Sequence, residues 1–290
     1  MHSLADLVGN TPMVELKKLS PNPKVTIYAK LEGNNPGGSV KDRPALNMIR
    51  SAIERGDIGS GTQLIEATSG NTGIALAMIA RLYDLDIELV MPSTSTRERT
   101  LTMEAFGAKV TLLDSIEVCR DYADEKAATG KFYILNQFAN PDNYLAHYKT
   151  TGPEIWRDTK KSLTHFVSSM GTTGTIMGCS RYFKEIDPSI QIVGCQPTEE
   201  SSIPGIRRWP TEYLPKIFEP DRVDRVMDVS QQEATLMTRQ LAKVEGIFAG
   251  MSSGGAASAA IRLAKELDKG VIVFIACDRG DRYLSSSLFG

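Results

Sequence analysis

Short apolar runs alternate along this chain with longer segments whose apolar residues recur at helical spacing. From Ala45 to Ile53 the apolar positions recur every three to four residues, and Gly56 follows as a helix stop signal. Such alternation predicts an α/β protein with a mostly parallel sheet. Strands are expected at residues 26–32, 63–68, 86–92, 108–114, 131–137, 163–170, 190–197 and 270–277, with helical segments between most of them.

Length, charge and cysteine content restrict the classes of function. The chain has 290 residues, enough for one large domain or two ordinary ones, and a formal net charge of -2 gives no general attraction to nucleic acid or anionic membranes. No apolar run is long enough to span a bilayer, and the first ten residues lack the features of a secretory signal. Four scattered cysteines favour reduced thiols over a disulfide framework or a metal site. We therefore expect a cytoplasmic protein that binds neither nucleic acid, membrane nor metal.

Two turns between an expected strand and an expected helix are small and polar. They are "TSGNTG" at residues 68–73 and "GTTGT" at residues 171–175. Small residues let backbone N–H groups converge on an anion, and a helix N-terminus adds partial positive charge. Glycine, serine and threonine are also ordinary turn formers and helix caps, so either turn alone leaves both interpretations open. Two such turns in one chain favour an anion-binding site.

Known phosphate and hydrolase motifs fit these turns poorly. Ile176 follows "GTTGT" where a P-loop has lysine, and no GxGxxG opens a first βαβ unit. A third turn, "GMSSGG" at residues 250–255, matches GxSxG around Ser252, but all three histidines precede that serine. The α/β-hydrolase order requires histidine after serine, so we expect Ser252 to bind a ring nitrogen or a phosphate instead.

Lys41 in "NNPGGSVKDRP" stands where a helix is expected to begin. The N-terminal end of a helix disfavours an ammonium group and favours a neutral amine, which suits a lysine that forms a Schiff base. Gly37 and Gly38 would let a flat cofactor approach the backbone. An imine-forming lysine and a phosphate-binding turn together suggest pyridoxal phosphate. The alternative interpretation is a loop followed by a charged first helical turn.

The stretch from Pro197 to Asp221 contains five prolines and few helix signals, so it is expected to be a long irregular loop. Loops of this length in compact domains are often functional. Arg207 and Arg208 lie in it, and the planar fork of arginine suits oxyanions.

Four spaced motifs, in order, resemble the cysteine synthase family of pyridoxal-phosphate enzymes. They are "NNPGGSVKDR", "EATSGNTG", "SSMGTTGT" and "SSIPGIRRWPTEYLP". The likeness runs from "GNTP" at residues 9–12 to "CDRGDRYLS" near the end, and "IRRWP", "AHYKTTGPEIW" and "CDRGDRY" are similar to the B-type branch of the family.

This resemblance implies roles for individual residues. Lys41 would bind the cofactor covalently and remove the α-proton of the substrate, Asn71 would bind the 3′-oxygen of the cofactor, and Ser252 would meet its pyridine nitrogen. The phosphate would be held by Gly171, Thr172, Thr173, Gly174 and Thr175. The substrate would be bound by Thr68, Ser69, Gly70, Thr72 and Gln137 at its carboxylate, with Arg207, Arg208, Cys277 and Asp278 near a thiosulfate donor.

The resemblance also implies a fold type II architecture, with two open sheets of the tryptophan-synthase β type flanking the cofactor. Residues 1–34 and 145–290 would form a larger domain, and residues 35–144 a smaller mobile domain. The reaction would replace the acetate of O-acetylserine by sulfide or thiosulfate, in a homodimer.

Other reactions of the same fold remain open. They include serine or threonine dehydration, cystathionine synthesis and an O-phosphoserine sulfhydrylase. A catalytically silent binding protein is the alternative from another class, although the presence of Lys41, Asn71 and the phosphate turn argues against it.

Overall fold

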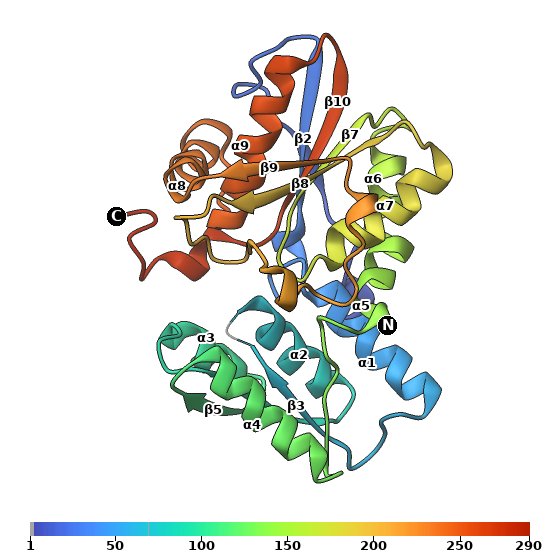
Figure 1. Ribbon diagram of the computed structural model, residues 1–290, viewed down its shortest axis with the longest axis vertical. Helices are drawn as coiled ribbons and strands as arrows, with labels where there is room; N and C mark the ends of the chain where they lie inside the picture. Colours follow the sequence, from blue (N-terminus) through green and yellow to red (C-terminus); the bar gives the residue numbers. More distant parts are fainter. Residues whose placement is uncertain (1–2, 69) are drawn as a thin grey trace.

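The computed structural model describes residues 3–68 and 70–290. Its strands form two sheets, one in each half of the molecule as drawn in Figure 1. The upper sheet has six strands in the order β1-β2-β10-β7-β8-β9; β1 is antiparallel to β2, and the other neighbouring pairs are parallel. Its strands are β1 (Met13–Glu15), β2 (Val25–Leu31), β7 (His165–Ser169), β8 (Gln191–Pro197), β9 (Arg225–Val229) and β10 (Gly270–Ala276).

The lower sheet has four parallel strands in the order β5-β4-β3-β6. They are β3 (Gln63–Ala67), β4 (Asp86–Pro92), β5 (Lys109–Leu113) and β6 (Phe132–Tyr133), all within residues 35–144. Two mostly parallel sheets confirm the expected α/β class. The exact domain boundary and the mobility of the smaller part stay predictions.

Helices cover both faces of the six-stranded sheet (Figure 1). Ile27 and Phe274 pack into the core under α8 and α9, whereas Phe166 and Val273 pack into the core under α7. Because both faces are buried, a strand such as "GVIVFIA" is almost uniformly apolar. The helices are α1 (Asp42–Arg55), α2 (Asn71–Leu82), α3 (Arg97–Ala105), α4 (Ile116–Ala128), α5 (Pro141–Ala146), α6 (Gly152–Asp158), α7 (Gly174–Ile186), α8 (Gln231–Gln240) and α9 (Met251–Glu266).

Short helical turns join these elements. Five are 3₁₀ turns, at Leu4–Leu7, Glu32–Asn34, Thr211–Tyr213, Pro220–Arg222 and Gly280–Tyr283, and two are π turns, at His147–Thr151 and Leu241–Glu245. The expected irregular loop after Pro197 therefore contains no more regular structure than two 3₁₀ turns among its described residues.

The eight expected strands are all present, and two further strands lay outside the predictions. β9 has only two buried residues, Met227 and Val229, because it is the edge strand of its sheet, so its apolar pattern is weak. β1 is three residues long. β6 pairs over two residues instead of the expected seven, because the chain turns away near Asn136, whose φ is 56°.

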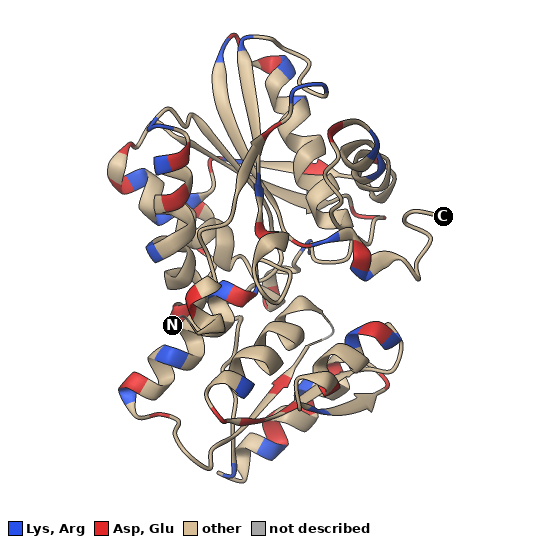
Figure 2. Cartoon of the chain, turned by 180° about the vertical axis from the view of Figure 1, so that it is seen from behind, with Lys and Arg blue, Asp and Glu red and all other residues tan. Residues whose placement is uncertain are grey.

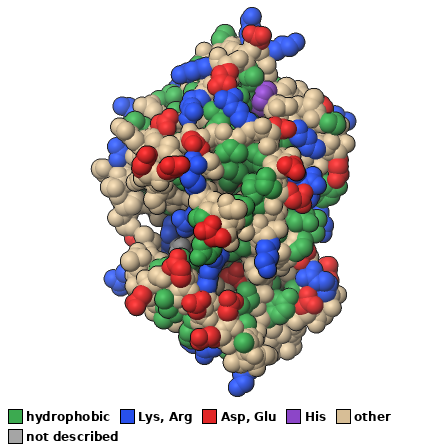
Figure 3. Space-filling model, viewed as in Figure 1, with side chains coloured by type: hydrophobic (Ala, Val, Ile, Leu, Met, Phe, Trp, Pro, Cys, Tyr) green, Lys and Arg blue, Asp and Glu red, His purple; other side chains and the backbone are tan. Residues whose placement is uncertain are grey.

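The carboxyl ends of β3, β7 and β10 meet at the junction between the two halves. β3 leads into α2, β7 leads into α7, and β10 leads into Cys277 and Asp278. In open α/β sheets ligands bind beyond such strand ends. Figure 3 shows the surface hollowed where the halves meet.

Charged side chains of both signs are interspersed over the helices of both halves (Figure 2). Among the described residues, no helix is both long and apolar enough to cross a bilayer.

Candidate active site

Lys41 lies immediately before α1, at the junction of the two halves. Its own N–H donates to Ser39 Oγ over 3.2 Å, and the preceding N–H of Val40 donates to the carbonyl of Cys277 over 2.8 Å. Gly38 has φ +81°, a left-handed conformation that favours glycine. The glycine turn and the end of β10 therefore fix the backbone that carries the lysine.

The side chain of Lys41 is partly buried. Within the described part of the chain, its amine has no hydrogen-bond or ion-pair partner. Burial lowers the pKa of this lysine, while the nearby Cys277 and Asp278 oppose the change. The structure thus favours the neutral amine, as expected for a lysine that forms an imine.

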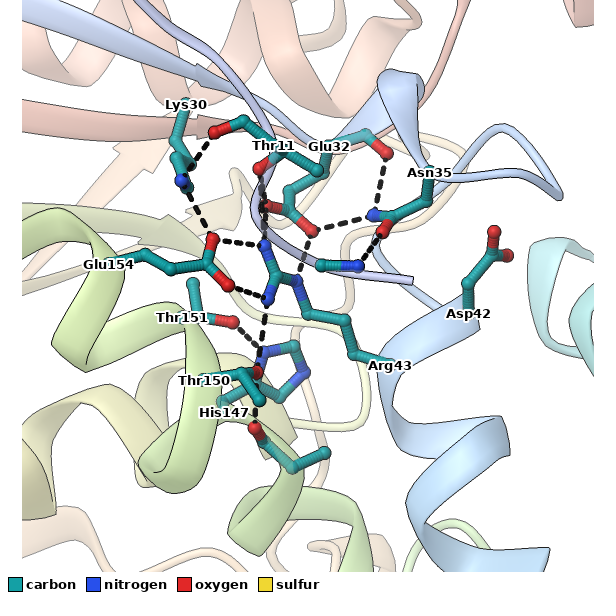
Figure 4. A network of polar contacts seen from close by, with 12 residues as sticks. Thr11, Lys30, Glu32, Asn35, Asp42, Arg43, His147, Thr150, Thr151 and Glu154 are labelled. Atoms are coloured by element: carbon teal, nitrogen blue, oxygen red, sulfur yellow. Dashed lines mark hydrogen bonds and ion pairs between the residues drawn. The ribbon is translucent and has the colours of Figure 1, made fainter. Parts of the chain in front are cut away.

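Arg43, two residues further on, anchors the start of α1 to the six-stranded half (Figure 4). Its guanidinium donates to both carboxylate oxygens of Glu32, over 2.7 and 2.8 Å, and to both of Glu154, over 2.7 and 2.8 Å. Further bonds reach Thr11 Oγ1 and Thr150 Oγ1. All five N–H donors of an arginine can be used in such a planar arrangement.

Lys30 completes this buried network. Its Nζ lies 2.8 Å from Glu154 Oε2 and donates to the carbonyl of Thr11 over 2.6 Å. Buried charges are tolerated only when paired and hydrogen-bonded, and here each cation meets carboxylates. The network therefore joins β2, α1 and α6 at Arg43, two residues after Lys41.

The turn at residues 171–175 forms the start of α7, which begins at Gly174. Thr173 has a left-handed backbone with φ 71°, and its buried Oγ1 has no partner among the described residues. Thr172 Oγ1 accepts from Asn143 over 3.3 Å, and Thr175 Oγ1 lies 3.3 Å from His147 Nε2. The N–H of Gly174 donates to Thr172 Oγ1 over 3.3 Å. An unpaired hydroxyl at the N-terminus of a helix is suited to a phosphate group.

The serine expected to meet the cofactor ring lies at the start of α9. Ser252 is buried in the first turn of this helix, and its carbonyl accepts from Ser169 Oγ over 2.8 Å. A Cβ added to Gly205 would lie 3.4 Å from Ser252 Oγ, so the irregular loop covers this hydroxyl closely. The thiol of Cys277 also lies next to Ser252, and burial raises the pKa of that thiol to about 12.

Asn71, the first residue of α2, is joined to the end of β10. Its Nδ2 donates to Asp278 Oδ2 over 2.7 Å, and Tyr283 donates to the same oxygen over 2.7 Å. Arg282 donates to Asn71 Oδ1 and to the carbonyl of Gly37. The roles of Arg282 and Tyr283 were missed from sequence, although both lie in the motif "CDRGDRYLS".

The expected carboxylate-binding residues come together only in part. Thr72 Oγ1 donates to Gln137 Oε1 over 2.7 Å, and both side chains are buried. Thr68 is buried at the end of β3, and Gly70 precedes α2. Ser69 lies outside the described residues.

The comparisons with known proteins agree with this geometry. The family model of pyridoxal-phosphate dependent enzymes matches residues 4–278. The cysteine synthase B of Pseudomonas aeruginosa is 59% identical and aligns with 99% of this chain and 97% of its own length. That of Escherichia coli is 55% identical, over 100% of this chain and 97% of its own. The solved cysteine synthase of Entamoeba histolytica has a TM-score of 0.94 at 35% identity, and the match covers 100% of this chain and 90% of that one.

The chain belongs to the family of pyridoxal-phosphate dependent enzymes. The resemblance to cysteine synthases of the B type, the fold type II architecture and the enzyme class are thereby confirmed. The cofactor is confirmed at the level of the family. The residues present fit it. Among the described residues, the amine of Lys41 and the buried hydroxyl of Thr173 have no partner, and the hydroxyl of Ser252 is buried near the same junction.

The two arginines of the irregular loop differ in their surroundings. Arg207 is exposed, and its guanidinium has no hydrogen-bond or ion-pair partner in the described chain. Arg208 donates to the carbonyl of Pro197 over 2.9 Å and pairs with Asp228 on β9 over 2.6 Å. Arg208 is therefore bound to Pro197 and Asp228 at the edge of the sheet, whereas Arg207 is exposed to solvent.

Trp209 links this loop to the phosphate turn, a contact that was not predicted. Its Nε1 donates to the carbonyl of Gly171 over 2.7 Å, and its ring packs edge-on against Phe138 at 5.6 Å. Among the described residues no group of histidines, cysteines and carboxylates could hold a metal ion.

Proposed function

We propose that this protein is a cysteine synthase that replaces the acetoxy group of O-acetyl-L-serine with sulfide. The observation that carries the proposal is the amine of Lys41, which has no hydrogen-bond or ion-pair partner among the described residues, lies near Cys277 and Asp278, and has a pKa that burial lowers. Three relatives named cysteine synthase B are 54–59% identical to it over nearly the whole chain.

Bound pyridoxal phosphate would supply an electron sink for the charge that develops at the substrate α-carbon. Lys41 Nζ would hold the cofactor and, once the substrate amine has displaced it, would take the α-proton; burial lowers the pKa of this amine, which assists a base. Ser252 would meet the ring nitrogen, and the N–H groups at the start of α7 with Thr173 Oγ1 would hold the phosphate. Asn71 would exchange its contact with Asp278 for the ring oxygen of the cofactor.

The substrate carboxylate would lie at the start of α2. Thr68, Gly70 and Thr72 carry the turn, and Ser69 belongs to it in sequence. Gln137 Oε1 is occupied by Thr72, which leaves its Nε2 to donate to the carboxylate. Loss of acetate breaks the Cβ–O bond, and the sulfur nucleophile forms the new Cβ–S bond at the same carbon.

Thiosulfate is the second donor that we propose, with S-sulfocysteine as its product. It is a dianion larger than sulfide, so it needs room and positive charge. Arg207 and, from its sheet-edge position, Arg208 would supply that charge. Cys277 and Asp278, beyond the end of β10, would shape the inner wall of this donor site.

The test is to incubate the purified protein with pyridoxal phosphate, O-acetyl-L-serine and sulfide, and to measure cysteine and acetate together. Equal amounts of both products support the proposal. Pyruvate from serine, or turnover of O-phosphoserine or homocysteine in preference, would assign another reaction of this fold. Absence of any imine absorbance would identify a silent binding protein.

Two further properties belong to this proposal. We propose a homodimer and a cytoplasmic location, as the family resemblance implies. Sedimentation of the purified protein and fractionation of cells test them.

A further inference from the structure

Glu66 is a buried carboxylate that the proposed chemistry leaves without a role. It is the fourth residue of β3 and only 4% exposed. Two residues after it comes the turn that would bind the substrate carboxylate. Within the described residues, Glu66 forms no ion pair, and a buried carboxylate without a cation is expensive unless hydrogen bonds satisfy it.

The backbone of the turn at residues 135–137 supplies those hydrogen bonds. The N–H of Asn136 donates to Glu66 Oε2 and the N–H of Gln137 donates to Glu66 Oε1, each over 3.2 Å. Asn136 has a left-handed backbone with φ 56°, and such a residue turns successive N–H groups toward one anion. Burial raises the pKa of Glu66 to about 7, and these amides oppose the rise. The ionised carboxylate therefore depends on this turn.

The same contact explains why β6 ends early. β6 pairs with β3 only at Phe132 and Tyr133. Beyond that point, the amides of residues 136 and 137 meet a side chain of β3 instead of its backbone carbonyls. The chain thus leaves the sheet at the position that brings Gln137 beside α2.

Gln137 is fixed on its other sides as well. Its Oε1 accepts from Thr72, and its backbone carbonyl accepts from Asn143 Nδ2 over 2.7 Å. Its Nε2 has no partner among the residues that the structure describes. The amide group is therefore oriented with one free donor, and its backbone position is set by Glu66.

We propose that Glu66 is a positioning residue for substrate binding: it clamps the backbone of residues 136 and 137 and so aims Gln137 Nε2 at the substrate carboxylate. The proposal rests on the proposed function, because that function supplies the carboxylate. Glu66 itself touches neither the substrate nor the cofactor in this assignment.

The variant Glu66→Gln tests the clamp in the holoenzyme. The amide keeps the shape of the side chain, but it presents an N–H group to one of the two backbone N–H donors. We expect KM for O-acetyl-L-serine to rise roughly tenfold, the effect of losing one charge-assisted hydrogen bond, with kcat nearly unchanged. Binding of L-serine, followed by the change in cofactor absorbance, should weaken by the same factor.

Glu88 offers a matched control. It is also 4% exposed, on the neighbouring strand β4, but its carboxylate binds Thr111, Tyr122 and Lys109, away from the turn. Glu88→Gln should alter stability without raising KM. If both variants change kcat and KM alike, Glu66 has only a structural role and the proposal is overturned.

Hydrogen exchange gives a readout that needs no turnover. In Glu66→Gln, a peptide covering residues 134–138 should exchange faster than in the wild type and in Glu88→Gln. Unchanged exchange together with unchanged KM would overturn the clamp. If Glu66→Gln fails to fold, Glu66→Asp keeps the charge but shortens the reach, and the same KM increase is expected.

The proposed cysteine synthase activity and the positioning role of Glu66 can be refuted separately. A wild type that binds L-serine but makes no cysteine would refute the proposed function, while the exchange result would still test the clamp. A wild type that makes cysteine, with an unaffected Glu66→Gln variant, would refute the clamp alone.

Discussion

Asp42 binds the backbone N–H of Gly37 with one carboxylate oxygen, while its other oxygen is buried without a partner among the described residues. A Cβ on Gly37 would lie 2.6 Å from that second oxygen, so this contact requires glycine at position 37. The pair closes the turn that leads into Lys41. The half-satisfied carboxyl also makes the stability of the fold sensitive to pH.

We predict that Asp42→Asn changes the pH dependence of stability. Burial raises the pKa of Asp42 from 3.8 to about 7. Between these values the folded protein keeps a proton that the unfolded chain releases. The stability that this proton contributes is complete below pH 3.8 and is lost as the pH rises toward 7, at up to about 1.4 kcal/mol per pH unit.

Asparagine cannot titrate, so the variant should gain stability relative to the wild type as the pH rises from 4 to 8. Urea unfolding at several pH values measures the difference in the free energy of unfolding. Parallel pH profiles for the two proteins would contradict the raised pKa.

Lys41→Ala should abolish both the imine absorbance and cysteine formation while leaving the fold intact. Among the described residues its amine forms no hydrogen bond or ion pair, so its removal disrupts neither. Circular dichroism and a thermal melt check the fold, and absorbance after addition of pyridoxal phosphate checks the imine.

Lys149 provides the control for this prediction, because it is an exposed lysine on the π turn after α5. Lys149→Ala should retain both the absorbance and the activity. Lys30 is unsuitable, since it is fully buried in ion pairs. Wild-type rates in Lys41→Ala would show that another group removes the α-proton.

Gly174→Ala should weaken cofactor retention. A Cβ at this position would lie 2.0 Å from Asn143 Oδ1. Asn143 binds Thr172 and the carbonyl of Gln137, so its displacement would disturb the phosphate turn and the substrate turn together.

Overpacking of this kind costs about 1–3 kcal/mol, and the same free energy lost from cofactor binding is roughly a fivefold to hundredfold loss of affinity. Cofactor content after dialysis measures it. Gly59→Ala is the control, because a Cβ there meets nothing within 4 Å. Equal cofactor content in both variants would argue against the assigned turn.

The sequence predicted the elements of the fold well where both faces of a strand are buried. β10 is an example, because its run GVIVFIA is continuously apolar, and β8 is another, because four successive residues from Ile192 to Cys195 are buried. β9 escaped prediction because three of its five residues are exposed. The early end of β6 depends on Glu66, a residue distant in sequence from Gln137, and no local pattern records such a contact.

In the candidate site, too, local sequence patterns predicted some features, and contacts between distant residues were missed. Lys41 and the phosphate turn follow from local patterns, namely a lysine at a helix start and small residues before a helix. The contacts of Asn71 with Asp278 and Arg282 join residues more than 200 positions apart. Their pairing depends on how the two halves fold against each other, which the motif spacing does not encode.

The last prediction concerns the sulfur donor. Arg207→Ala should lower kcat/KM for thiosulfate by about tenfold to a hundredfold, the range for losing one charge-assisted contact of about 1.5–3 kcal/mol. The rate with sulfide should change little, because that smaller anion needs less positive charge at the entrance. Arg207 is exposed and its guanidinium forms no hydrogen bond or ion pair with the described residues, so the variant should disturb the packing little. Arg208→Ala is the informative comparison: it removes the ion pair with Asp228, so it should affect the loop more than the choice of donor.

Equal losses with both donors in Arg207→Ala would assign Arg207 a general role in the loop. Unchanged rates with both would leave it an ordinary surface arginine, and thiosulfate would then need another source of positive charge.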